Sequence, residues 1–492
     1  MTTLAKYQIS SLALAFGLSL VAACGGDKAG EANNKDKDAD AKEEGADKQA
    51  DKKTDEKADA AAGDAAAGGE QAAGDAAAGD APPANPGEAG PAYFAVNNKG
   101  IAKLDGGAWS LISSEENRYV SDMFTGPDGA VYVLDYNGLH KINGDKIEKV
   151  VDFGYKDIGT ASHVAMAKGG DLWATNYKGV GHYTGGAWTL TEKEKIGEGG
   201  VDMLTDVAVD AGGTPWVSGS KVVLKFADDK WSNVDLSMLG DNPYLFRLGT
   251  SPSGDVYGQT SREIIKFSGD KAEKIEINSK NFMGYGAAME FGPSGQVAVS
   301  SSLCDVARLD PAKPEEVWLL SKEDVDCLSF QALALDGQNR VWLASREGLS
   351  VIGSDKKATE YGTGTVMELV GTVSHVAVVG AGPTLPAVGD AHTGGITGKV
   401  LMDGSAIASA KIEMCPSPQI FGTGSPCSTS KVKFEGSTNE KGEFTFETVP
   451  LGDYNIAVEI DGKWRSNYIP SFATKMKEGQ TYDVGSVTYS KM

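Results

Sequence analysis

The chain has 492 residues, of which 68 are acidic and 46 are lysine or arginine, so its formal net charge is −22 at neutral pH. A surface that binds nucleic acid or anionic lipid headgroups needs clustered positive charge. The composition therefore argues against a nucleic-acid partner, and we expect none.

Residues 1–23 have the pattern of a secretory signal peptide. Lys6 supplies positive charge, and the apolar run over 9–21 is too short for a membrane-spanning helix. The run leads into VAAC at 21–24, which resembles the bacterial lipobox. This resemblance implies lipidation of Cys24 and a membrane anchor, in which each buried methylene group contributes roughly 0.8 kcal/mol. An ordinary signal peptide that ends near a cysteine is the alternative.

Residues 24–92 are expected to form a disordered linker that begins with the lipidated cysteine. From 25 to 92 the chain uses only Gly, Ala, Asp, Glu, Lys, Asn, Gln, Thr and Pro, with 17 acidic residues against 8 lysines. Such a segment cannot build a core and repels itself, which predicts an extended acidic tether. Gly25 is not the aspartate associated with inner-membrane retention in enteric bacteria. We therefore expect a cell-envelope location at the outer membrane, on its periplasmic or surface face.

Cysteine usage supports export. Besides Cys24, four cysteines form two local pairs in the sequence, Cys304 with Cys327 and Cys415 with Cys427. Disulfides are the expected state of such pairs in an oxidising compartment. Buried free thiols are the alternative for the first pair. Neither pair has CxxC spacing or a histidine close in sequence, so no metal or other cofactor is expected.

Residues 93–380 contain an internal repeat. A turn followed by a strand with one anchor residue recurs at spacings of 38, 41, 43, 41, 41 and 44 residues. Each unit has room for four short strands, the size of one propeller blade, and radial closure hides the sheet edges. The first unit lacks an innermost strand, and SHVAV at 374–378 matches SHVAM at 162–166, so the end of the array is predicted to complete the first blade. The anchors are Phe94, Tyr132, Trp173, Trp216, Tyr257, Ala298 and Trp342.

These repeats resemble the two-component-regulator propellers, whose signature combines a D-x-x-G-type turn, a W-V-x-T-like strand and a Gly-Leu step. The resemblance implies an all-β fold with a seven-bladed β-propeller over 93–380. It implies little about function, because propellers host many unrelated activities.

After a linker at 381–393, residues 394–492 are predicted to form a small β-sandwich. The motifs NEKGEFTF at 439–446 and PLGDY at 450–454 resemble the carboxypeptidase regulatory-like domain. This resemblance implies a transthyretin-like fold without peptidase chemistry. Gly442 and Gly452 are expected in turns. Strand alternation predicts four residues on the core face: Phe444, Phe446, Tyr454 and Ile456.

One position near the start of each innermost strand is a candidate channel site. It lies ten residues before the anchors, and the position after it is apolar in every unit. Because that apolar neighbour should pack between blades, the candidate position should point into the central channel near its mouth. Carboxylates and imidazoles there could serve proton transfer, whereas a wet, polar channel lining is the alternative. Five of the seven residues are ionisable: Asp122, His163, Asp206, Arg247 and His375.

The loop after each anchor strand is a second candidate surface. Tyrosine and arginine carry much of the binding energy at interfaces. Ordinary turn chemistry of asparagine and glycine is the alternative. The candidate binding residues in these loops are Asn98, Tyr136, Asn176, Tyr177, Arg262 and Arg346.

Common catalytic signatures are absent: the sequence holds no GxSxG elbow, HExxH pair or P-loop. We therefore expect a membrane-anchored extracytoplasmic binding or scaffold lipoprotein whose propeller loops take a protein, peptide or glycan. The alternative is a lyase or hydrolase at the channel mouth that resembles virginiamycin B lyase, although that family's full set of catalytic histidines and glutamates cannot be placed here. A sensing role, implied only by the repeat family, is the third hypothesis.

Overall fold

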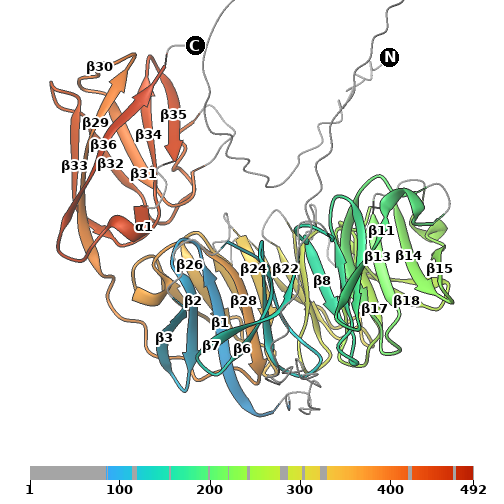
Figure 1. Ribbon diagram of the computed structural model, residues 1–492. Coiled ribbons are helices and arrows are strands. Elements are labelled where there is room, and N and C mark those ends of the chain that lie inside the picture. The colour runs from blue at the N-terminus through green and yellow to red at the C-terminus, as the bar shows by residue number, and fades with distance from the viewer. Residues whose placement is uncertain are drawn as a thin grey trace, which may run out of the picture. The chain divides into compact units, whose positions relative to one another are not determined.

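The computed structural model describes residues 85, 87–113, 119–153, 157–197, 200–219, 221–240, 244–277, 286–301, 305–321, 330–418, 424–468 and 472–490. Within these residues the protein forms nine four-stranded sheets (Figure 1). Seven sheets come from the repeat region and two from the C-terminal region. The predicted all-β fold class is therefore confirmed. No helix among the described residues is long and apolar enough to cross a membrane.

Each repeat folds into an antiparallel sheet in which the chain runs outward from the channel. Blade 2 begins with the inner strand β4 (Val120–Thr125), continues through β5 (Val131–Asp135) and β6 (Gly138–Asn143), and ends at the outer strand β7 (Lys146–Asp152). Strand β5 is buried at all of its positions, whereas β7 is mostly exposed. The second strand is covered by the neighbouring blades, while the outer strand faces solvent.

Blades 3 to 7 repeat this order. From inside to outside, their strands are β8 (His163–Met166), β9 (Leu172–Thr175), β10 (Gly179–Thr184) and β11 (Ala187–Glu192); β12 (Leu204–Val209), β13 (Pro215–Gly219), β14 (Val222–Ala227) and β15 (Lys230–Asn233); β16 (Arg247–Thr250), β17 (Val256–Gln259), β18 (Glu263–Ser268) and β19 (Lys271–Glu276); β20 (Gly286–Phe291), β21 (Val297–Ser301), β22 (Val306–Leu309) and β23 (Trp318–Leu320); and β24 (Phe330–Leu335), β25 (Val341–Ser345), β26 (Gly348–Ile352) and β27 (Ala358–Gly362). Three short 3-10 turns precede inner strands: η1 (Lys193–Lys195), η2 (Ser237–Leu239) and η3 (Met367–Leu369).

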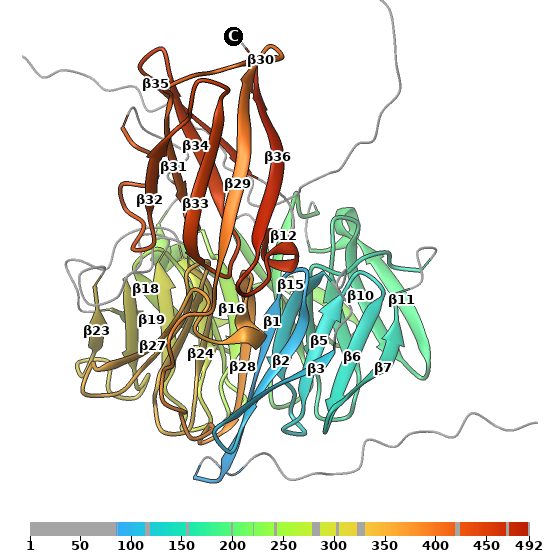
Figure 2. The same ribbon diagram turned by 90° about the vertical axis from the view of Figure 1, so that its left-hand side faces the viewer.

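Blade 1 is built from both ends of the repeat region. Strands β1 (Ala89–Val96), β2 (Gly100–Asp105) and β3 (Ala108–Ser113) receive β28 (Val373–Gly380) as their inner strand. Figures 1 and 2 show blue β1 beside orange β28. The register pairs Ala95 with His375 and Phe94 with Val376. The predicted completion of the first blade by the C-terminal strand is confirmed.

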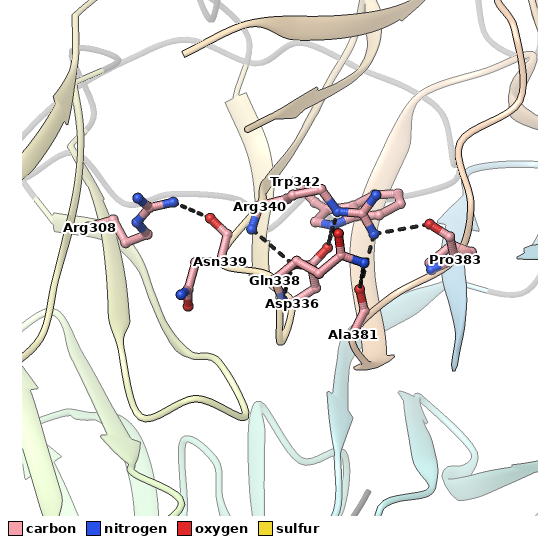
Figure 3. A network of polar contacts seen from close by, with 8 residues as sticks. All are labelled: Arg308, Asp336, Gln338, Asn339, Arg340, Trp342, Ala381 and Pro383. Atoms are coloured by element: carbon pink, nitrogen blue, oxygen red, sulfur yellow. Dashed lines mark hydrogen bonds and ion pairs between the residues drawn. The ribbon is translucent and has the colours of Figure 1, made fainter. Parts of the chain in front are cut away.

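A polar network holds the chain where it leaves β28 (Figure 3). The buried carboxylate of Asp336 accepts hydrogen bonds from Arg340 Nε at 2.7 Å and Trp342 Nε1 at 2.8 Å. Arg340 Nη2 donates in turn to the carbonyls of Ala381 at 3.1 Å and Pro383 at 3.0 Å. We call this network the clasp, because it ties the exit of the ring-closing strand to the first turn of blade 7.

The anchor aromatics pack between blades, as the repeat predicts. Phe94 and Trp342 are fully buried, and their ring centroids lie 6.0 Å apart across the junction of blades 7 and 1. Trp173 and Trp216 are buried at two other junctions. Burial of such a side chain contributes roughly 1.5–3 kcal/mol, so the anchors account for much of the cohesion between blades.

The C-terminal region forms two further sheets. In the first, β29 (Thr393–Met402) pairs with β30 (Ser405–Ala406), β33 (Glu443–Pro450) and, in parallel, β36 (Thr481–Tyr489). The second has the order β32 (Phe434–Ser437), β31 (Lys411–Cys415), β34 (Asn455–Ile460), β35 (Lys463–Tyr468), and one short helix, α1 (Phe472–Lys475), precedes β36. The predicted core residues are buried: Phe444, Phe446, Tyr454 and Ile456. Gly442 has a φ of +77° in the turn before β33.

One predicted disulfide is present, and three other cysteines lie outside the described residues. Cys415 and Cys427 are bonded, with their Cα atoms 5.7 Å apart. Cys304, Cys327 and the expected lipidation site Cys24 fall outside the described ranges.

Candidate functional site

The two candidate sets share one end of the propeller. In each blade, the start of the inner strand pairs with the end of the second strand, as Asp122 does with Leu134 and His163 with Thr175. The loop that enters an inner strand and the loop between the second and third strands must therefore lie at the same end. We call this end the loop face, and it surrounds the channel mouth.

His163 lies between two carboxylates from neighbouring blades. Its Nδ1 atom is 3.6 Å from Asp206 Oδ1 and 3.9 Å from Asp122 Oδ2. Burial lowers the pKa of His163, but the carboxylates of Asp206 and Asp122 outweigh burial and raise it above the usual value. The imidazole therefore holds its proton more strongly than a free histidine does.

Backbone donors hold both carboxylates in place. Asp206 accepts from Val207 N at 2.8 Å and from Leu248 N of the next blade at 3.0 Å. Asp122 accepts from Met123 N at 2.8 Å. Burial raises the pKa of Asp122, but His163 and the other nearby cations outweigh it and lower that pKa below its usual value. Fixed charge of this kind is suited to binding or to stabilising a positive group.

Arg247 and His375 complete the predicted channel set. His375 Nδ1 lies 3.1 Å from Ser374 Oγ, and burial lowers the pKa of this histidine below its usual value. Arg247 lies close enough to Asp122, His163 and His375 for its positive charge to lower the pKa of each. The structure therefore brings together all five ionisable residues that the repeat alignment singled out.

Glu290 belongs to the same cluster and was missed. It lies on β20 and is exposed within the channel, yet the surrounding protein and the carboxylates of Asp122 and Asp206 raise its pKa to about 8. The signal was present in the repeats, because the matching positions of the other units hold only alanine, glycine or phenylalanine. A charged residue at a repeat position that is uncharged in every other unit is a candidate functional residue.

The loop-face candidates separate into exposed and turn-forming residues. Tyr136 and Tyr177 are 56% and 72% exposed. Asn176 is buried, and its Oδ1 accepts from Lys178 N at 2.8 Å and Gly179 N at 3.0 Å, so its amide supports the turn and is not accessible to a ligand. Asn98 has a φ of +59°, which is also turn chemistry.

Both candidate arginines are exposed. Arg262 lies in the loop before β18 and Arg346 in the loop before β26. Burial raises the pKa of the Asp453 carboxyl, and the positive charge of Arg346 opposes this rise because it favours the ionised form. This arginine therefore has an acidic residue near it.

Further exposed apolar side chains lie on the loop face, in the loops that enter the inner strands of blades 2, 4 and 5. Tyr119, Met203, Met238 and Tyr244 are 65%, 48%, 41% and 42% exposed. With the two candidate tyrosines they make six large apolar side chains across four consecutive blades. We call this set the rim residues: Tyr119, Tyr136, Tyr177, Met203, Met238 and Tyr244.

Metal chemistry has no support in the described part of the chain. No group of three or more histidine, cysteine, aspartate or glutamate side chains there could hold a metal ion.

No protein-family model and no curated protein matches the chain. Among solved structures, a streptogramin B lyase is 14% identical with a TM-score of 0.41, over 59% of this chain and 92% of that one. The extracellular domain of a putative one-component system from B. thetaiotaomicron is 11% identical with a TM-score of 0.40, over 71% of this chain and 56% of that one. PorZ, a surface component of the type-IX secretion system of Porphyromonas gingivalis, is 12% identical with a TM-score of 0.42, over 77% and 64%. Likenesses this distant assign no activity, and the fold rests on the strand pairing of the chain itself.

Proposed function

We propose that the chain is an exported, lipid-anchored binding protein of the bacterial cell envelope whose loop face holds a protein ligand. The observation that carries this proposal is the gathering of the six rim residues on one face of blades 2 to 5. Exposed tyrosine and methionine are enriched at protein interfaces. Peptides and glycans are the other ligands that such a face could take.

Two further observations support an extracytoplasmic location. The Cys415–Cys427 disulfide is of the kind that persists in oxidising compartments. The sequence before residue 25 has the pattern of a lipoprotein signal, and the acidic linker expected at 24–92 would give the propeller reach from the membrane. Mass spectrometry of the mature N-terminus of the unsubstituted protein tests the anchor, and a Cys24→Ser variant should lose its membrane association. An unmodified Cys24 in the mature protein would contradict it.

The loop-face proposal is tested by cross-linking in cells. A photoreactive amino acid replaces Tyr177, and the captured protein is identified by mass spectrometry. The double variant Tyr136→Ser/Tyr119→Ser should then reduce capture at least fivefold, because it removes two exposed rim residues of the neighbouring blade. The matched control is Leu111→Ser/Val150→Ser, which removes exposed apolar side chains from the outer strands β3 and β7. Equal capture by both double variants would refute the proposal.

Catalysis at the channel mouth is the second candidate. It is favoured by the position of His163 between two fixed carboxylates, with Glu290 in the same cluster. His163→Ala and His375→Ala should abolish such an activity while leaving capture by the rim residues intact. Loss of capture in these variants would instead extend the protein-binding surface into the channel mouth.

A further inference from the structure

A row of buried polar side chains stands directly behind the channel cluster. The row consists of one residue in the last two positions of the second strands of blades 3, 5 and 6: Thr175, Gln259 and Ser300. These residues pair with His163, Arg247 and Ala288. Cross-strand partners project from the same face of a sheet, so the row lies beside the channel positions. All three residues are at most 1% exposed.

Three polar atoms of this row lack a hydrogen-bond partner among the described residues. They are Thr175 Oγ1, Gln259 Oε1 and Ser300 Oγ. Gln259 Nε2 donates to the Ser300 carbonyl at 2.9 Å, which fixes the amide and leaves its oxygen as an open acceptor. The matching positions of blades 7, 1 and 2 hold Ala344, Ala95 and Leu134, so the polar row is confined to one side of the channel. A buried acceptor that has no donor among the described residues is a position where a water or a ligand can supply one.

The charges in the channel also favour a ligand that donates hydrogen bonds and carries a positive charge. Among the described channel residues, three carboxylates lie with one permanent cation, Arg247, and the imidazole of His163. The carboxylates are those of Asp122, Asp206 and Glu290. Two of the carboxylates are fixed by backbone donors, and Glu290 remains reachable from the channel. Protonation of Glu290 removes its negative charge from the cluster. A bound cation would compensate the same charge equally well if Glu290 were ionised.

We propose that the channel mouth binds a primary ammonium group, carried by a small polyamine or by the free amino terminus of a peptide. An ammonium offers three donors to spaced acceptors, whereas a metal ion needs close ligands that the described residues do not provide. Glu290, Asp122 and Asp206 supply the charge, and Gln259 supplies a neutral acceptor. This site goes beyond the proposed function, since capture by the rim residues does not require it.

The proposal includes a proton balance. Glu290 is largely protonated at pH 7, because its pKa is about 8. When an ammonium binds beside it, the carboxyl ionises, its proton leaves to solvent, and the new carboxylate pairs with the ligand. Binding should therefore release about one proton near pH 7.

Titration calorimetry on the full chain tests the site, with spermidine and glycyl-glycinamide as probes and N-acetyl-glycyl-glycinamide and glutarate as controls. Measurements at pH 7 in two buffers of different ionisation enthalpy count the released protons. Saturable binding of one or both amines with proton release is expected, and binding of spermidine alone would identify the polyamine as the source. Glu290→Gln should weaken binding at least tenfold and abolish proton release.

The matched control is Glu273→Gln on β19, which removes the same charge from an exposed position outside the channel cluster. This control matters because the net charge of −22 attracts cations to the whole chain. Equal losses in the two variants would overturn the proposal, as would the absence of saturable amine binding or equal binding of glutarate. Gln259→Leu should also weaken binding at least threefold, with Ser300→Ala as the substitute if Gln259→Leu does not fold. If a folded Gln259→Leu or Ser300→Ala variant binds the amine with unchanged affinity, the buried polar row does not contribute to the site.

Discussion

At the level of single residues, an acidic turn residue recurs with an aromatic and a cation. Asp128 Oδ2 accepts from Lys141 Nζ at 2.7 Å and from the Tyr132 hydroxyl at 2.9 Å. In blade 5, Asp255 accepts from Lys266 Nζ at 3.0 Å, and that lysine lies over the ring of Tyr257. The clasp is the blade 7 version of this arrangement. The recurring D-x-x-G-type turn therefore has a structural role at the end opposite the loop face.

Glu290 is different, because its charge is unfavourable in the folded protein. Its pKa rises from an ordinary 4.5 to about 8, so the folded state binds more protons than the unfolded state between these values. Stability must then fall as pH rises through this interval and level off above it. Glu290→Gln removes the effect, and we expect it to raise the free energy of unfolding by roughly 1 kcal/mol above pH 8, a figure reduced for solvent screening in the channel.

Thermal unfolding of both proteins between about pH 3.5 and pH 9 measures this difference. The two curves should converge below pH 4.5, where Glu290 becomes protonated in the unfolded state as well as in the folded state. A constant gap across the whole range would mean that the substitution acts through packing and that the pKa of Glu290 is ordinary.

Sequence reasoning found most of the channel residues because the anchors set the register of every inner strand. His163 and Asp206 followed directly from that register. Glu290 escaped because it lies two residues further along, where no other unit carries a charge. Asn176 was misplaced as a ligand residue for another reason: asparagine suits a buried turn and an exposed contact equally well, and only its hydrogen bonds distinguish them.

At the level of elements, the clasp is expected to stabilise the ring. The side chains of Asp336 and Arg340 are 0% and 15% exposed. Arg340→Met keeps the apolar stem but removes the positive charge paired with the buried Asp336 carboxylate and the donor to the Pro383 carbonyl. Trp342 Nε1 still donates to Asp336, and Gln338 Nε2 still donates to the Ala381 carbonyl. Removing one partner of a buried pair typically costs about 3 kcal/mol.

Urea denaturation measures the effect, with Lys357→Met as the control. Lys357 and Asp355 form an exposed pair 3.7 Å apart, whose loss should cost less than about 0.5 kcal/mol. Similar midpoints for the two variants would show that the clasp contributes nothing to closure.

The Cys415–Cys427 disulfide should stabilise the C-terminal sandwich. Its cysteines are 12 positions apart, and closing a loop of that size typically contributes about 2–3 kcal/mol by restricting the unfolded chain. Cys415→Ala/Cys427→Ala should lower the thermal midpoint of the sandwich by several degrees. Calorimetry with and without reductant checks this, because the double variant should no longer respond to reduction at this site.

The strands were easier to predict than the short helical elements. Turn residues and alternating burial mark strands such as β5 and β33 in the sequence. The 3-10 turns and α1 have only three or four residues each, too short for a helical period to register. Their positions are decided by how the chain crosses between blades or sheets.

At the level of the whole molecule, the two ends of the repeat region meet in one sheet. The hydroxyl of Ser374 donates to the carbonyl of Ala95 across 279 positions of the chain. Because such a contact forms only after the intervening blades are ordered, closure of the ring belongs late in folding. The sequence match between 162–166 and 374–378 predicted this closure, while the clasp that secures it depends on side-chain geometry no repeat pattern reveals.

Two truncated chains test whether closure of the ring by β28 stabilises the propeller without the C-terminal sandwich. A chain ending at Pro383 keeps β28 and the clasp carbonyls, whereas one ending at Gly371 loses both. The shorter chain also loses Val373, Val376 and Val378, all buried, and at about 1.5–3 kcal/mol each their loss approaches the 5–15 kcal/mol that stabilises a typical domain. It would also leave the edge of β1 unpaired and open to aggregation. We expect one cooperative melting transition for the longer chain and aggregation for the shorter one, checked by calorimetry and size-exclusion chromatography. Matching transitions in the two chains would mean that the ring does not depend on its last strand.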